Sequence, residues 1–115
     1  MSSSRVISRK QWLQMVRQRG CQICRRPCEP HHPRDYRLGS GAAKKADDYY
    51  VIGLCREHHE DAHAHPKDFD NVGMAIRTME DVRQAHGLEG AIMELASGLE
   101  TIEEAVRFLK NFDEG

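Results

Sequence analysis

The sequence has no long apolar run, few aromatic residues and no leader-like start. No apolar stretch approaches the length that a membrane-crossing helix requires. The first residues lead into polar Gln11 and Arg17, so no secretory signal is expected. Only 39% of the 115 residues are hydrophobic and 6% are aromatic, so the core is expected to be small and to gain from a structural metal. These features predict one cytoplasmic domain over residues 1–115, with no membrane association.

The formal net charge of -1 conceals a strong asymmetry along the chain. Residues 1–45 contain eleven Lys and Arg against two acids, whereas residues 46–115 contain six bases and sixteen acids. Such a separation of charge points to nucleic acid as a partner of the basic part. It also predicts two surfaces of opposite charge on one small protein.

Local patterns predict an α+β protein built in three parts. A helix is expected over 8–20, where Ser8 and Gln11 form a capping box and Gly20 ends the helix. Within a core over 21–65, residues 49–52 resemble a β-strand, and a polar helix runs from Arg56 to about His65. Residues 66–115 are predicted to form a helical extension: a helix capped by Asp68, a short helix over 88–98, and a last helix with a capping box at Thr101.

Cysteine and histidine are concentrated in the core. Six of the seven histidines lie between positions 31 and 65, and all four cysteines lie in or beside that window. Two pairs keep a two-residue gap, Cys21 with Cys24 and Cys55 with His58. Three thiolates and one imidazole are the closed tetrahedral set of a structural Zn²⁺ site. The alternative is four free buried cysteines. Cys28 could replace His58 as the fourth ligand, but its three-residue gap from Cys24 favours a spare thiol.

A second set of possible ligands consists of histidines alone. His59 and His63 are four residues apart on a predicted helix, so both imidazoles project from one face and can chelate one ion. His31 and His32 adjoin in an extended segment, where neighbouring side chains point in opposite directions. One of them can then bind metal while the other faces a substrate. The alternatives are a solvated histidine-rich surface and a single metal site with redundant ligands.

The order of these motifs resembles the HNH (His-Asn-His) endonucleases, and most of all a phage and prophage branch related to Ref-type recombination nucleases. The resemblance rests on Cys21-Gln-Ile-Cys24, on Pro30-His31-His32-Pro33-Arg34, and on the string from Lys45 through Cys55-Arg-Glu-His58-His59 to His63. It covers about residues 20–65. This chain departs from the pattern at Gly53, where proline is usual, and by the extra Cys28; Asp48 stands where the wider family has Asn.

The resemblance implies a ββα-metal nuclease core and a role for each matching position. His32 would be the general base, and Asp48 would orient it or brace the loop. His31, His59 and His63 would hold one catalytic divalent ion, either Mg²⁺, Mn²⁺, Zn²⁺ or Ni²⁺. The implied substrate is DNA, and the implied process is recombination, repair or DNA processing.

The basic residues that flank these strings are the expected contacts to DNA phosphates. They are Arg25, Arg26, Arg34, Arg37, Lys44 and Lys45. Arg34 is the main candidate because it also belongs to the resembling string. The sequence also fits two other interpretations: a non-catalytic zinc-knuckle DNA-binding module, and a phage accessory protein that binds a protein partner or a second copy through its acidic C-terminal helices.

Overall fold

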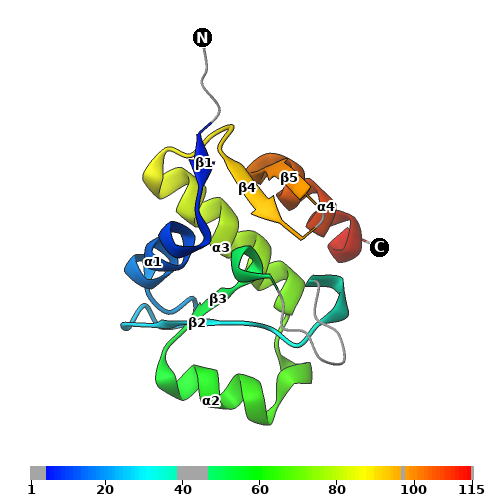
Figure 1. Ribbon diagram of the computed structural model, residues 1–115. Helices are drawn as coiled ribbons and strands as arrows, with labels where there is room; N and C mark the ends of the chain where they lie inside the picture. Colours follow the sequence, from blue (N-terminus) through cyan, green and yellow to red (C-terminus); the bar gives the residue numbers. More distant parts are fainter. Residues whose placement is uncertain (1–4, 39–46, 97, 115) are drawn as a thin grey trace.

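The computed structural model describes residues 5–38, 47–96 and 98–114, which form four α-helices and two small sheets (Figure 1). The α-helices are α1 (Arg9–Arg19), α2 (Arg56–Ala64), α3 (Asn71–His86) and α4 (Ile102–Glu114). The strands are β1 (Val6–Ile7), β2 (Glu29–His31), β3 (Ile52–Leu54), β4 (Ile92–Leu95) and β5 (Gly98–Thr101). Short 3-10 helices cover Tyr36–Leu38 (η1), Asp48–Tyr50 (η2) and Pro66–Asp68 (η3). The described part is therefore α+β, as predicted.

Helix α1 has the boundaries that its capping residues predicted. The Ser8 hydroxyl accepts a hydrogen bond from the Gln11 backbone N–H, and the Gln11 side chain accepts one from the Ser8 N–H. Gly20 ends the helix at a φ of 88°, a left-handed value that glycine adopts without the steric cost of a side chain. The helix buries Trp12 and Val16 against the rest of the core.

Strands β2 and β3 pair antiparallel and lead directly into α2. Their register places His31 opposite Ile52 and Pro30 opposite Gly53. A side chain at Gly53 would come within 2.9 Å of the Gly20 carbonyl oxygen and 3.0 Å of the Cys28 sulfur. The β3 backbone thus passes close to the turn after α1, which explains why glycine occupies this position. The predicted strand at 49–52 is displaced, because Tyr49 and Tyr50 lie in η2 and pairing begins at Ile52.

Helix α3 lies at the centre of the molecule, with α1 and α4 beside it and the β2–β3–α2 unit below (Figure 1). Its buried residues include the predicted apolar positions, namely Val72, Ala75, Ile76, Met79 and Val82. The predicted cap was wrong: Asp70, not Asp68, accepts the Gly73 N–H at 3.0 Å. Asp68 is instead the last residue of η3, a short turn that Pro66 begins.

The prediction of a short helix over 88–98 was wrong. Ile92–Leu95 and Gly98–Thr101 form the antiparallel pair β4–β5, and β4 also pairs in parallel with β1. The extension after residue 66 is therefore a helix, a hairpin and a second helix, and its sheet includes the start of the chain. Among the described helices, none is long and apolar enough to cross a membrane.

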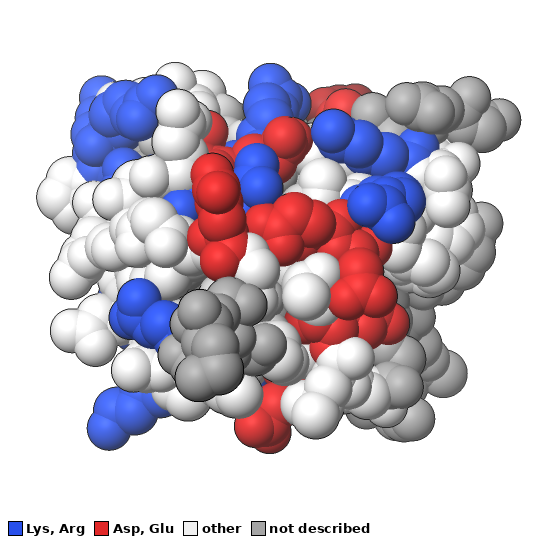
Figure 2. Space-filling model, turned by 90° about the horizontal axis from the view of Figure 1, so that it is seen from above, with Lys and Arg blue, Asp and Glu red and all other residues white. Residues whose placement is uncertain are grey.

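Acidic and basic side chains intermingle more than the sequence predicted. Arg9, Arg19 and Arg26 each pair with an acid from the later part of the chain, namely Asp47, Asp81 and Glu57. From above, Asp and Glu side chains gather across the middle of the visible face, with Lys and Arg side chains between and around them (Figure 2). The charge of the basic part is therefore partly neutralised by acids that the fold brings to it.

Candidate metal centres

Cys21, Cys24, Cys55 and His58 meet where the turn after α1 approaches the start of α2. Their ligand atoms all lie within 4.8 Å of one another, a group that could hold a metal ion. The His58 Nδ1 lies 3.5 Å from the Cys21 sulfur and 3.2 Å from the Cys55 sulfur, and the Cys24 and Cys55 sulfurs are 3.6 Å apart. The structure thus brings together the four residues that spacing selected.

The electrostatics of this group favour thiolate at Cys21. Burial acts to raise the pKa of Cys21, but hydrogen bonds from the backbone N–H groups of Cys24, Cys55 and Ile23 and from His58 outweigh it and lower the pKa to about 6. Cys55 is the N-cap of α2, so its sulfur lies at the start of that helix. A deprotonated sulfur is the form that binds metal.

Cys28 lies outside this group, as predicted for a spare thiol. Its sulfur faces the Val16 carbonyl oxygen at 3.4 Å. Burial raises the pKa of the Cys28 thiol, so the group stays protonated at neutral pH.

His31, His59 and His63 form a second group whose ligand atoms also lie within 4.8 Å of one another. The Nε2 atoms of His59 and His63, one turn apart on α2, are 3.1 Å apart. His31 approaches them from β2, with its ring edge-on to both at centroid distances of 4.8 and 5.3 Å. Helix α2 therefore contributes His58 to one group and His59 and His63 to the other.

His31 is the buried member of the histidine group. The residue is only 5% exposed, and its Nδ1 has no hydrogen-bond partner among the described residues. Burial, followed by the nearby His59 and His63, lowers the pKa of His31 to about 4. A neutral imidazole with an unpartnered nitrogen, aimed at two other imidazoles, has the chemistry of a metal ligand.

His32 lies beside this group and has a different partner. Its Nε2 is 2.6 Å from the Asp48 carboxylate, which η2 presents from the other side of the site. Both side chains stay accessible, at 22% and 34% exposure. The alternation predicted for His31 and His32 is confirmed, because one enters the histidine group while the other faces Asp48.

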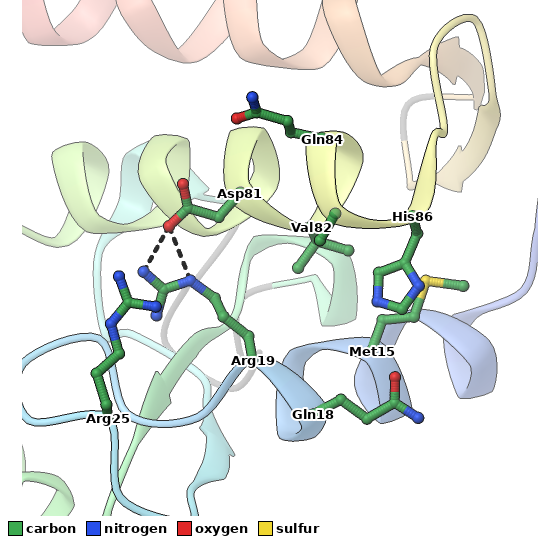
Figure 3. A pocket seen from close by; sticks show the side chains of 9 residues that line it. Met15, Gln18, Arg19, Arg25, Asp81, Val82, Gln84 and His86 are labelled. Carbon is green, nitrogen blue, oxygen red and sulfur yellow. Dashed lines mark hydrogen bonds and ion pairs between the residues drawn. The ribbon is translucent and has the colours of Figure 1, made fainter.

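The basic residues expected at DNA lie in different surroundings. Arg34 is exposed and lines a cavity of about 240 Å³ together with His31, His63 and Asn71. Arg37 is bound by both Asp35 oxygens, and Arg26 pairs with Glu57. Arg25 lines a separate cavity between α1 and α3, beside the Arg19–Asp81 ion pair (Figure 3). Lys44 and Lys45 lie outside the described residues.

Two further residues at the histidine group had no sequence signal. Glu29 lies 3.7 Å from the His59 Nδ1, on the side of the ring opposite the Nε2 that faces His63. Asn71, the first residue of α3, lines the Arg34 cavity, although it comes from a helix that carries no predicted site residue. The position of Asn71 beside this cavity depends on how α3 packs against the core, so the sequence alone could not indicate it.

Comparison with known proteins gives a family but no activity. The model of a protein family of unknown function, DUF968, matches residues 3–84, which include both candidate metal groups. No curated protein and no solved structure matches the chain. Because the match covers well over half of the sequence, the chain belongs to the DUF968 family.

Proposed function

We propose that this protein is a metal-dependent endonuclease of the HNH type that hydrolyses DNA phosphodiester bonds. The observation that carries the proposal is the position of the His32–Asp48 pair, joined at 2.6 Å, beside the cluster of His31, His59 and His63. A general base next to a divalent-metal site is an arrangement suited to the hydrolysis of a phosphodiester. The order β2–β3–α2 around the cluster agrees with a ββα-metal core.

The ligand distances fit the two ions that the proposal implies. A tetrahedral Zn²⁺ with bonds of about 2.3 Å to sulfur sets its ligand atoms roughly 3.8 Å apart, and with bonds of about 2.0 Å to nitrogen roughly 3.3 Å apart. The distances of 3.2–3.6 Å in the thiolate group and 3.1 Å between His59 and His63 lie close to these values. Three imidazoles favour Zn²⁺, Ni²⁺ or Mn²⁺ over Mg²⁺, which prefers oxygen ligands.

The role of His32 follows from its hydrogen bond. A carboxylate accepts only, so the neutral imidazole donates from Nε2 to Asp48 and keeps a lone pair on Nδ1. That nitrogen accepts the proton of the attacking water, and Asp48 then stabilises the imidazolium that results. A divalent ion on the three histidines would stabilise the charge that develops on the phosphate and the leaving oxygen. Arg34, exposed at the adjoining cavity, binds a phosphate of the substrate.

The test is cleavage of supercoiled plasmid DNA across a series of Mg²⁺, Mn²⁺, Zn²⁺ and Ni²⁺, with an EDTA control. His32→Ala should lower the rate at least about a hundredfold, since a general base contributes that much or more. Its zinc content and circular dichroism should equal those of wild type. His86→Ala, the same change at an exposed histidine at the end of α3, is the matched control and should cut normally. Cleavage by His32→Ala at the wild-type rate would contradict the assigned role.

A second candidate function is binding of a protein partner without catalysis. It is favoured by exposed apolar side chains in the C-terminal part, namely Leu99, Phe108 and Phe112, with exposures of 68%, 48% and 37%. Phe108 and Phe112 contact each other at a centroid distance of 5.2 Å on α4. This function needs the thiolate group for folding but not the histidine cluster. A wild-type protein that leaves the plasmid intact with every metal would favour it over the nuclease.

A further inference from the structure

Two adjacent carboxylates at the start of η2 point to opposite sides. Asp48 faces His32, as described above. Asp47 faces α1 and the segment that follows β4, and its side chain is only 10% exposed. Asp47, the less exposed of the two, contacts neither group of candidate metal ligands, yet it is the immediate neighbour of a residue in the proposed active site.

Asp47 joins three segments through its two oxygens. Its Oδ1 accepts the backbone N–H of Tyr49 at 3.2 Å, which caps η2, and it also receives the Arg9 guanidinium from α1. Its Oδ2 accepts the N–H of Ala96, just after β4, at 3.2 Å. The carboxylate therefore fixes η2 to the N-terminal helix and to the C-terminal hairpin at once.

Arg9 completes this connection. Its other guanidinium nitrogen donates to the Glu94 carbonyl oxygen on β4, and its guanidinium carbon lies 5.0 Å above the centre of the Tyr49 ring. The hydrogen bond to Asp47 raises the pKa of Arg9, so its charge persists at any working pH. The Tyr49 hydroxyl donates to the Ile7 carbonyl oxygen, which fixes the next residue of η2 to β1.

We propose that Arg9 and Asp47 are positioning residues for the nuclease site, and that they connect the C-terminal hairpin to it. The inference rests on the proposed function. A 3-10 helix of three residues has few hydrogen bonds of its own, so its orientation depends on its cap. Asp48 meets the partly exposed His32 through one hydrogen bond, and a small rotation of η2 breaks that contact. Arg9 and Asp47 prevent this rotation.

The test compares Asp47→Ala, Asp47→Asn, Arg9→Ala and the Arg9→Ala/Asp47→Ala double variant on supercoiled plasmid with Mn²⁺. Loss of a residue that orients a catalytic group costs about 10–100-fold in activity. We expect kcat to fall by that factor at Asp47→Ala and Arg9→Ala, with KM within about twofold of wild type. Asp47→Asn keeps one oxygen that can accept a hydrogen bond, so its kcat should fall less than that of Asp47→Ala. The double variant should lose less than the product of the two single losses, because both single variants remove the shared Arg9–Asp47 interaction.

The matched control is Asp81→Ala, which breaks another ion pair between α1 and a different element (Figure 3). It should retain the wild-type kcat. A second measurement, independent of cleavage, is the position of the His32 ring ¹H–¹⁵N resonances, which should move in Asp47→Ala and Asp47→Asn but not in Asp81→Ala. If Asp47→Ala fails to fold, Asp47→Asn and Arg9→Lys replace it, since a lysine cannot reach both Asp47 and Glu94.

The outcomes separate the two proposals. A wild type that does not cleave would refute the nuclease, while the His32 resonances would still decide whether Asp47 positions that ring. A wild type that cleaves, together with Asp47 variants that match Asp81→Ala in kcat and in the His32 resonances, would overturn the positioning role alone.

Discussion

Neighbouring histidines in this chain have different environments and therefore different chemistry. His31 is buried, and its Nδ1 has no partner within the part of the chain that the structure describes. His32 is bound to Asp48, and His58 contacts two cysteine sulfurs. Alternation in a strand predicted that His31 and His32 point in opposite directions, and the four-residue repeat of a helix predicted that His59 and His63 share a face. The family resemblance alone implied which of His31 and His32 joins the metal group. The sequence could not predict Glu29 or Asn71 at the site, because their positions depend on packing between elements.

At the thiolate group, we expect Cys24→Ala to abolish metal binding and Cys28→Ala to leave it intact. Only the Cys24 sulfur lies among the four ligand atoms, whereas the Cys28 sulfur faces a backbone carbonyl. The measurement is the thiolate charge-transfer absorption of cobalt-substituted protein, which does not detect ions bound by histidine alone. Wild type and Cys28→Ala should show the band, and Cys24→Ala should lose it. Equal bands in all three proteins would remove Cys24 from the ligand set.

The buried His31 predicts a loss of stability in acid when the histidine cluster holds no ion. Its pKa is lowered from 6.5 to about 4 on folding, so below pH 6.5 the unfolded chain binds the proton more readily. The free energy of unfolding should then fall as the pH falls, by about 2 kcal/mol between pH 7 and pH 5, and this group should have no effect above that range. Urea unfolding at both pH values measures the change.

The control for this measurement is His31→Asn, which cannot titrate in that range. The variant should show a smaller decrease between pH 7 and pH 5, with the difference equal to the contribution of His31. The same decrease in both proteins would mean that other groups cause the acid sensitivity.

At the scale of elements, boundaries set by capping were predictable and long-range pairing was not. Ser8 with Gln11 and Thr101 with Glu104 form the capping boxes that their spacing indicated. Residues 88–98 were predicted as a helix because Leu88, Ile92 and Leu95 recur at helical spacing. The structure makes them part of a sheet, since β4 pairs with β1 from the opposite end of the chain. The local sign of the turns in the sequence was the glycines that flank β4, namely Gly87, Gly90 and Gly98. In the structure all three adopt positive φ values, which glycine reaches without steric cost.

The capping box of α4 predicts a defined loss of stability in Thr101→Ala. The Thr101 hydroxyl accepts the Glu104 N–H at 3.1 Å, while the Glu104 carboxylate accepts the Thr101 N–H at 3.0 Å. Removing the hydroxyl should cost about 1 kcal/mol in the free energy of unfolding. Ser8→Ala, which removes the equivalent hydroxyl from α1, should cost a similar amount in the same urea titration. Unchanged stability in Thr101→Ala would show that α4 depends on packing alone.

At the scale of the whole molecule, the separation of charge along the sequence overstates the separation in space. Arg9, Arg19 and Arg26 are neutralised by acids that follow residue 46, so the expected basic surface is reduced. Arg34 differs, since within the described ranges no acidic side chain pairs with it and it opens onto the cavity of His31 and His63. The position of this one exposed arginine is therefore better support for the proposed binding of nucleic acid than the total charge of the basic part.

If the protein binds DNA as proposed, this difference predicts how much each arginine contributes to the affinity. Each phosphate contact adds about one to the slope of log affinity against log salt concentration. Arg34→Ala should therefore lower that slope by about one and weaken binding of every duplex sequence alike. Arg37→Ala should change the slope by less than half as much, because both Asp35 oxygens already hold its guanidinium. Fluorescence anisotropy with a labelled duplex over a KCl series, with Ca²⁺ as the only added divalent ion, measures both slopes. If the two variants have equal slopes, Arg34 makes no phosphate contact that Arg37 lacks, and its proposed contact to a substrate phosphate is wrong.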